Sequence, residues 1–468
     1  MTSQTLLYII VIPLCWLFLS RLKDVRSRQV LSLLTSYLLY SSWGFRFLGV
    51  LMCSSLLNYS IGILLRCKQS AARLCLGIAV NVAILSIFKY LPAIVPFLPH
   101  LLTSVTFANI ALPVGISFWT FQALSYLFDL YRGEDIEPSQ VEFLLYMAYW
   151  PIVLSGPICR LSALLPQFRK TSGPSKEDLQ CGLDRISIGL VMTAFGQVLA
   201  SGVHIGEGLD HIFDSFPSGL TGLDVWCVAI GYGFVLFFNF AGYSHIVIGA
   251  ARLFAIRLDE NFDRPYFATS PSEFWTRWHM SLSFWIRDYL FLPIVMLRRG
   301  KWWRSFSLVL SMVVFGLWHK ASLLFVVWGL YHGTLLVLHR RWQELQRRMS
   351  WRLPHLVLGP ASWLMTFSTI CLGWVFFRVG TFSQALAMLR AVVSPATYSG
   401  HVLPCSLYFL VSTLGLAYFG AIIAGLLWRR YGRVLTIPQE CRFALYSIAV
   451  YIGFLHTAQT QAFIYFQF

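Results

Sequence analysis

The amino-acid sequence predicts an all-α polytopic membrane protein, with about eleven transmembrane helices plus re-entrant or broken helices around a central intramembrane cavity. Hydrophobic residues make up 57% of the chain and charged residues only 12%, and the mean hydropathy is +0.66. This composition is typical of polytopic membrane proteins and not of soluble chains of this length. The basic residues also form short clusters between apolar runs, as the positive-inside rule expects of cytoplasmic loops.

The formal net charge of +16 does not indicate a nucleic-acid partner, because the basic residues are divided among short loops and do not form one continuous patch. The expected surroundings are membrane lipid. The ten cysteines are scattered without a Cys-x-x-Cys spacing, so the sequence indicates neither a disulfide framework nor a metal site. The first apolar run lacks a basic stretch before it and a cleavage pattern after it, which favours a retained span over a removed signal peptide.

A spanning helix needs about 20 mostly apolar residues. By this measure we expect spans at 5–20, at two places between 30 and 65 with a turn near Trp43 and Gly44, and then at 75–89, 110–131, 186–203, 225–254, 306–318, 323–338, 356–377, 407–428 and 443–465. The basic cluster after the first span predicts that the N-terminus lies outside the cytoplasm.

Two stretches do not fit simple spans. Residues 141–158 are apolar but are interrupted by Trp150-Pro151 and by a Ser-Gly-Pro run, which predicts a re-entrant or broken helix buried in protein. Residues 257–304 hold many charges and many aromatic residues. We expect them to form a partly re-entrant layer on the cytoplasmic side.

Two histidines within apolar sequence are the main candidates for chemistry. His279 lies in the aromatic segment 274–289, and His319 lies in 315–320. An ionisable side chain at membrane depth costs free energy unless it has partners or a task, so it is a candidate functional residue. Two of them together indicate a reaction centre.

The run RWHMSLSFWIRDY at 277–289 resembles a signature of the membrane-bound O-acyltransferase family. Further blocks in the same order are LPVGISF at 112–118, ENF at 260–262 and GWVFFR at 373–378. The similarity points to the bacterial branch of alginate O-acetylation and teichoic-acid D-alanylation proteins, and the last block favours the alginate type. We expect one membrane domain over 1–468, with a family-like core at 36–378 that includes a catalytic segment at 274–333, and C-terminal transmembrane helices at 379–468.

The resemblance assigns roles to both histidines. His319 matches the family's near-invariant histidine and is expected to be the general base for a hydroxyl, whereas the structural alternative is a hydrogen bond between helices. His279 matches the upstream partner of that residue. It is expected to orient the acceptor or to donate a hydrogen bond to the thioester oxygen, and a purely structural role is the alternative.

Seven further residues are candidates for substrate binding: Arg277, Trp278, Arg287, Asp288, Lys320, His332 and Asn239. The two arginines and the aspartate form an ion-paired frame in one interpretation and contact a phosphate in the other. His332 lines the cavity or packs.

Three single positions depart from the family pattern, as does the IVM run at 294–296, which stands where the family often has Gly-Gly-Asn. Asn239 and His245 replace acids, and Lys320 replaces a glycine. Lys320 lowers the pKa of His319 if both share a poorly hydrated cavity, meets a donor phosphate, or extends into water.

The implied reaction moves an acyl group, above all acetyl, from a cytoplasmic thioester to a hydroxyl of a cell-surface polysaccharide or peptidoglycan. Acetyl-CoA is the expected donor and an acyl carrier protein the alternative, and no bound cofactor or metal is expected. A periplasmic or secreted acetyltransferase partner and a location in the bacterial inner membrane are also implied. The alternatives are D-alanyl transfer to teichoic acid and a proton-coupled transporter.

Overall fold

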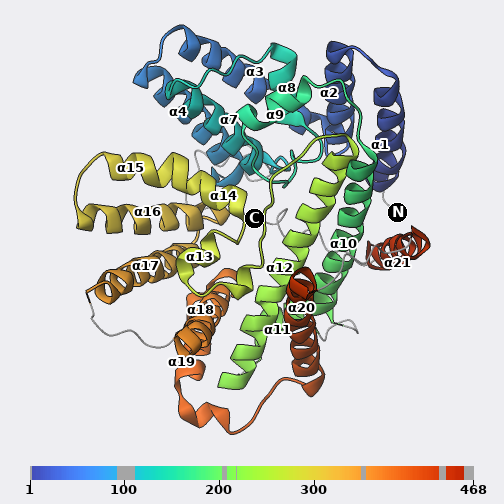
Figure 1. Cartoon of the computed structure of the whole chain (residues 1–468). Helices are drawn as coiled ribbons and strands as arrows, with labels where there is room; N and C mark the ends of the chain where they lie inside the picture. The colour runs from blue at the N-terminus through green and yellow to red at the C-terminus, as the bar shows by residue number, and fades with distance from the viewer. Residues whose placement is uncertain are drawn as a thin grey trace, which may run out of the picture. The chain divides into compact units, whose positions relative to one another are not determined.

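The computed structural model describes residues 3–91, 111–202, 208–217, 219–348, 355–431 and 439–457, and every regular element within them is helical (Figure 1). The all-α prediction is therefore confirmed for these residues. Up to residue 253 the helices are α1 (Ser3–Arg21), α2 (Val25–Ser41), α3 (Phe45–Cys67), α4 (Ala71–Lys89), α7 (Ile116–Tyr131), α8 (Gln140–Ala148), α9 (Leu161–Phe168), α10 (Lys176–Ser201), α11 (Leu209–Ser215) and α12 (Gly222–Leu253). From residue 301 onward they are α16 (Lys301–His319), α17 (Leu323–Gln346), α18 (His355–Arg378), α19 (Phe382–Val393), η5 (Pro395–Tyr398), α20 (Cys405–Tyr431) and α21 (Gln439–Thr457).

Seven helices within the described residues are long and apolar enough to cross a membrane: α3, α4, α10, α12, α17, α18 and α20. Two shorter apolar segments, Leu6–Arg21 and Phe382–Val393, accompany them. The chain is thus a multi-pass membrane protein, and the count of eleven crossings stays a prediction. The predicted turn near Trp43 is confirmed, since α2 ends at Ser41 and α3 begins at Phe45.

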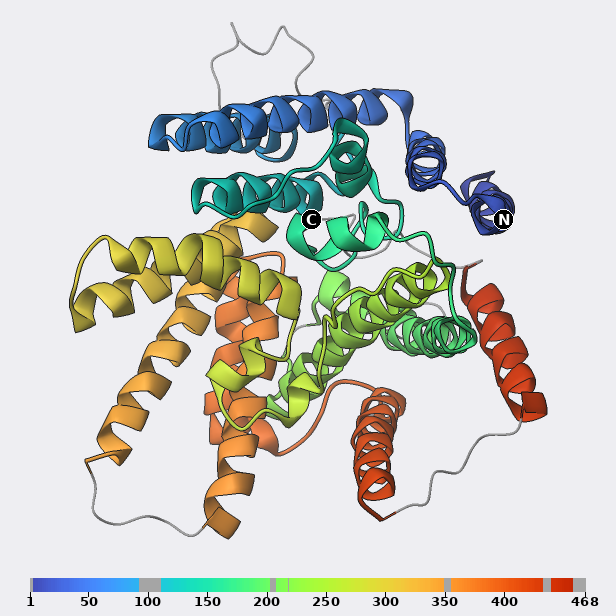
Figure 2. The ribbon, with the colours of Figure 1, turned by 45° about the horizontal axis from the view of Figure 1, so that its top comes forward.

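The described residues form two compact units. The first comprises the chain up to Ile186 together with Ser244–Glu260, and the second comprises Ser187–Tyr243 and the chain from Asn261 onward. In the first unit α3 packs on α4 and α7, and α2 packs on α1, α3 and α8 (Figure 2). The expectation of one membrane domain stays a prediction.

The predicted interruption of residues 141–158 is confirmed. Helix α8 ends at Ala148, and the chain from Tyr149 to Cys159 is buried without forming a continued helix. Backbone of this kind persists in an apolar setting only where protein covers it and satisfies its polar groups. Whether the segment crosses the membrane stays a prediction.

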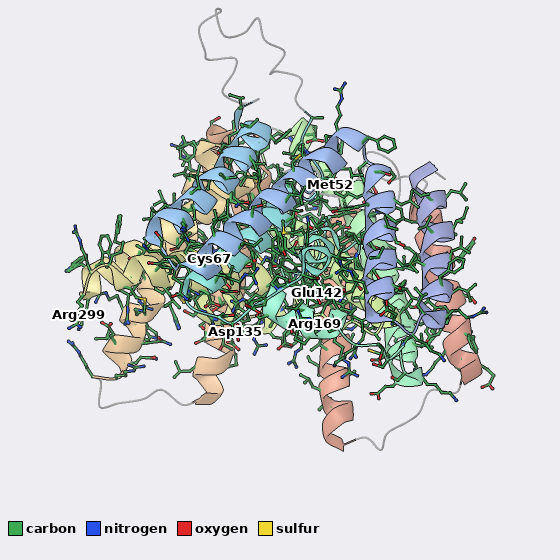
Figure 3. All side chains as sticks on the ribbon, turned by 90° about the horizontal axis from the view of Figure 1, so that it is seen from above. Met52, Cys67, Asp135, Glu142, Arg169 and Arg299 are labelled. Carbon is green, nitrogen blue, oxygen red and sulfur yellow. The ribbon has the colours of Figure 1, made fainter. Side chains whose placement is uncertain are left out.

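A buried carboxylate anchors the start of α8. Glu142 accepts two hydrogen bonds from Arg169, at 2.7 and 3.0 Å, and its side chain closes a capping box with Ser139 (Figure 3). Gln29 donates a further bond at 3.1 Å. Burial raises the pKa of a carboxyl, but the hydrogen bonds from Arg169 and Ser139 outweigh it and lower the pKa of Glu142 to about 2. Glu142 thus ties α8 to α2 and to the end of α9.

In the second unit, α16 and α17 form the most extensive helix pair because glycines allow their backbones to approach. A Cβ on Gly316 would lie 2.1 Å from the carbonyl oxygen of Phe325, and one on Gly329 would lie 2.4 Å from that of Met312. Small residues at such a contact are the usual means of close helix packing in membranes. The close approach holds the C-terminal end of α16, where His319 lies, against α17.

The predicted layer at 257–304 is a series of short elements rather than a span. It contains η3 (Pro265–Phe267), α13 (Pro271–Trp275), α14 (Met280–Trp285), the π-helix η4 (Ile286–Phe291) and α15 (Leu292–Met296). In the second unit α13 packs against α17, and η4 packs against α14, α15 and α16. A π-helical turn inside an α-helical segment frequently marks a functional region. Its position relative to a membrane stays a prediction.

Candidate active site

His279 is held in a strained backbone conformation immediately before α14. Its φ of 41° and ψ of 57° lie in the left-handed region, which costs a residue with a side chain about 1–2 kcal/mol. The side chain is 1% exposed, and its ring meets Phe240 edge-on at 4.5 Å between centroids. Burial lowers the pKa of His279 to about 3, so its imidazole is neutral at physiological pH.

The side chain of Asn261 orients the His279 ring. The Oδ1 atom of Asn261 lies 3.1 Å from Nδ1 of His279. The same atom accepts hydrogen bonds from the Ser281 hydroxyl at 2.9 Å and from the Ser281 backbone N–H at 3.3 Å. A backbone N–H can only donate, which identifies this Asn261 atom as an acceptor. Nδ1 of His279 therefore carries the proton, and Nε2 of the neutral ring carries the lone pair.

His319 is the last residue of α16 and is 4% exposed. Aromatic rings surround it: the ring centroids of Trp318, Phe377 and Trp328 lie at 4.6, 5.0 and 5.7 Å. A three-residue turn, 320–322, separates it from α17. His319 is therefore a buried histidine at the break between α16 and α17, in the apolar sequence that made it a candidate.

One continuous aromatic cluster connects the two histidines within the second unit. From His279 it passes through Phe262 at 6.4 Å and on to Trp278, 5.1 Å from Phe262. Trp278 lies 4.9 Å from Trp374, which lies 6.5 Å from Trp328 beside His319. Trp278, predicted to bind substrate, is thus a buried member of the cluster that joins the two candidate catalytic residues. The apolar rings exclude water, which strengthens electrostatic interactions inside the site.

Polar groups of four side chains in this cluster, Trp275, Trp374, Trp328 and His332, make no hydrogen bond with any residue that the structure describes, and the last two are the most deeply buried. One is the indole N–H of Trp328, which is 1% exposed and contacts His319. The other is His332, which is fully buried 4.8 Å from Trp328 and has neither ring nitrogen bonded. Buried donors and acceptors are normally satisfied, so each such group needs an explanation. A ligand bound within the cluster is one.

All three charged candidates form ion pairs. Arg287 and Asp288 pair with each other, whereas Arg277 pairs with a different residue. Arg287 binds the neighbouring Asp288 at 2.7 Å and covers the ring of Phe284 at 4.9 Å. Arg277 instead binds Glu273 one helical turn earlier, at 2.6 Å. The geometry matches the ion-paired interpretation and adds Glu273 to it.

The remaining candidates lie apart from the aromatic cluster. Lys320 caps α16 and is exposed, so it does not share a dry cavity with the buried His319. Asn239 is buried on α12 against α10, where a Cβ on Gly196 would lie 2.6 Å from its Oδ1 atom. A close helix contact therefore accounts for Asn239. His245 lies 3.3 Å from Arg185, which pairs with Glu260 in the first unit.

The sequence analysis assigned no role to Asn261 or Trp328. Asn261 belongs to the ENF block, so a polar residue inside a family-like block could have drawn attention to it. Trp328 carries no sequence signal among 17 tryptophans. It stands out in the structure because it combines near-complete burial, an indole N–H without a hydrogen bond to any described residue, and contact with His319.

A multi-pass helical membrane protein with two buried histidines in one aromatic cluster is the class that fold and site define. The chain belongs to the MBOAT, or membrane-bound O-acyltransferase, family, whose profile matches residues 98–377. It is an acyltransferase.

Named relatives support this assignment over most of the chain. The probable alginate O-acetylase AlgI of Pseudomonas aeruginosa is 33% identical over 81% of this chain and 72% of its own length. The peptidoglycan O-acetyltransferase of Helicobacter pylori is 29% identical over 77% of this chain and 72% of its own. The teichoic acid D-alanyltransferase of Streptococcus thermophilus is 30% identical over 56% of this chain and 68% of its own.

Proposed function

We propose that this protein transfers an acetyl group from acetyl-CoA to a hydroxyl of a cell-surface polysaccharide or of peptidoglycan, from a position in the bacterial inner membrane. The observation that carries the proposal is the buried, neutral His279, oriented by Asn261, in one aromatic cluster with His319. The O-acetylating relatives support acetyl, since they cover more of the chain than the D-alanyltransferase does. A periplasmic partner that passes the acetyl group onward belongs to the same proposal.

In the proposed reaction His319 removes the proton from the acceptor hydroxyl. The hydroxyl oxygen attacks the thioester carbonyl, the C–S bond breaks, and the leaving thiolate of CoA takes the proton that His319 accepted from the hydroxyl. His279 has its N–H directed at Asn261, so its Nε2 lone pair is suited to accept a hydrogen bond from the sugar and not to donate one to the thioester. Of the two roles that the sequence left open for His279, we therefore favour orientation of the acceptor.

The donor to the developing oxyanion is then another group, and we assign it to Trp328. Its indole N–H is buried, is bonded to no described residue, and lies beside His319. A fixed donor at the position of the developing charge is worth about 10²–10³ in turnover. Trp328→Phe keeps the apolar ring contact and removes this donor, so turnover should fall by about that factor with little change in donor KM.

The test uses the purified full chain in lipid nanodiscs with acetyl-CoA, and measures thiol release and acetate on an added polysaccharide acceptor. We expect His319→Ala to abolish acetyl transfer while its membrane expression stays near wild type. Retained turnover in this variant would remove His319 as the base. A wild-type protein that released thiol only with a D-alanyl carrier protein would favour D-alanyl transfer, and pH-coupled flux without thiol release would favour a transporter.

A further inference from the structure

A small cavity lies within the first unit, whereas His279 and His319 belong to the second. Residues of α1, α2, α8 and α9 and of the chain that follows α8, α9 and α12 line it, and it encloses about 50 Å³. On this measure a single water needs about 10–15 Å³, so the cavity has room for about three or four waters or for one phosphate group. It is partly open to the outside, so a ligand can enter it.

The lining is positive and contains no carboxylate. Arg28 and Lys170 are its charged residues, and Gln29, Ser32, Gln167 and Ser172 add polar groups. Arg28 bonds the carbonyl oxygens of Leu19 and Leu22 through Nη1 alone, and these bonds do not use its Nη2 and Nε donors. Lys170 is exposed and makes no ion pair with a described residue. Two cations with donors to spare indicate an anionic ligand.

A second observation points to a ligand independently. Tyr149 lines the cavity and is only 3% exposed, yet its hydroxyl has no hydrogen-bond partner among the described residues. Leaving a buried hydroxyl unbonded costs about 1–3 kcal/mol. A ligand with an acceptor oxygen would remove that cost. Glu142, the carboxylate nearest to Tyr149 in sequence, is already bound by Arg169 (Figure 3) and is not among the residues that line the cavity.

We propose that this cavity binds one phosphate group, with Arg28 and Lys170 supplying charge and Tyr149 donating a hydrogen bond from its hydroxyl. The rest of the lining is apolar and includes Leu19, Leu145, Phe254 and Ile256. A phospholipid with an anionic headgroup matches both parts of the lining, because its phosphate meets the cations and its glycerol and acyl carbons meet the apolar side chains. A soluble phosphate compound shares the same chemistry, and the experiment distinguishes the two sources.

The experiment measures how fast an amine-reactive reagent modifies Lys170 in the purified full chain, read by peptide mass spectrometry. Lys68, an exposed lysine in the same unit that does not line the cavity, is the internal control. The protein is placed in phosphatidylcholine nanodiscs, in phosphatidylglycerol nanodiscs, or in phosphatidylcholine nanodiscs with added inorganic phosphate. Tyr149→Phe and Arg28→Gln are prepared in parallel.

Modification of Lys170 should slow in phosphatidylglycerol or with inorganic phosphate, while that of Lys68 does not. Protection by phosphatidylglycerol alone identifies a lipid site, and saturable protection by inorganic phosphate identifies a soluble ligand. Tyr149→Phe and Arg28→Gln should each weaken the protection about tenfold, the effect of losing one hydrogen bond to a charged group. Equal reactivity of Lys170 under all three conditions would overturn the proposal, as would protection that both variants retain or that Lys68 shares.

Discussion

The orientation of His279 by Asn261 leads to a prediction about one amide. Asn261→Ala removes the acceptor that lies 3.1 Å from Nδ1 of His279 and leaves a buried N–H without it. An unsatisfied buried donor costs about 1–3 kcal/mol. The ring can avoid this cost by moving its proton to Nε2 or by turning, and in either case the lone pair no longer faces the acceptor. The fraction of productive enzyme, and with it turnover, should fall roughly 5- to 150-fold.

The matched control is Ser281→Ala. It removes the hydroxyl that donates to the same Asn261 atom at 2.9 Å but leaves the contact with His279 intact. Loss of one net hydrogen bond of about 0.5–1.5 kcal/mol should then affect stability more than turnover. The assay is initial-rate thiol release from acetyl-CoA by purified protein, with thermal unfolding of each variant measured alongside it.

Asn261→Asp gives the complementary result. A carboxylate still accepts from Nδ1, so orientation is retained, but its charge stabilises imidazolium and should raise the pKa of His279 by about 1–3 from its depressed value of about 3. If turnover requires neutral His279, the acidic limb of its pH profile should move to higher pH by that amount. Wild-type turnover in Asn261→Ala, or a loss no larger than that of Ser281→Ala, would refute the orienting role of Asn261.

Three other substitutions, one of them with a control variant, test the fold and the residue that follows His319. Glu142→Gln should lower the free energy of unfolding at pH 7 by about 1–3 kcal/mol. Because the pKa of Glu142 in the folded protein, about 2, lies below its ordinary 4.5, this loss of stability relative to wild type should be full above pH 4.5 and should shrink towards pH 2. Thermal unfolding of both proteins across this pH range measures it. Gly329→Ala should separate α16 from α17 and lower both the unfolding midpoint and turnover, whereas Gly420→Ala, with nothing within 4 Å of its new Cβ, should lower neither. Lys320→Gly should leave the pH profile of turnover unchanged, because Lys320 is exposed. It should weaken donor binding up to about fivefold and make that binding less dependent on salt. A shift of the acidic limb of the pH profile would instead show that Lys320 lowers the pKa of His319.

The sequence alone was sufficient for the all-helical membrane class, and it identified both histidines as candidates whose catalytic roles stay predictions. Apolar runs long enough to span a bilayer predicted helices such as α3 and α12, because backbone in lipid must satisfy its own hydrogen bonds. The Trp-Pro and Ser-Gly-Pro interruptions predicted the end of α8, since proline lacks the N–H that a continuing helix requires. His279 and His319 were identified because ionisable residues in apolar sequence are costly and therefore few.

What required the tertiary structure was which residues act on these histidines. Asn261 and His279 lie 18 positions apart and meet only because the chain between them, which contains η3 and α13, folds back on itself. Asn239, by contrast, was predicted to bind substrate, but it packs against Gly196 of a helix far away in sequence. Hydrophobic periodicity reports which faces of a helix are buried and not which partner buries them. The tautomer of His279 and the unbonded indole of Trp328 depend on such partners, so they became visible only when distant segments were placed side by side.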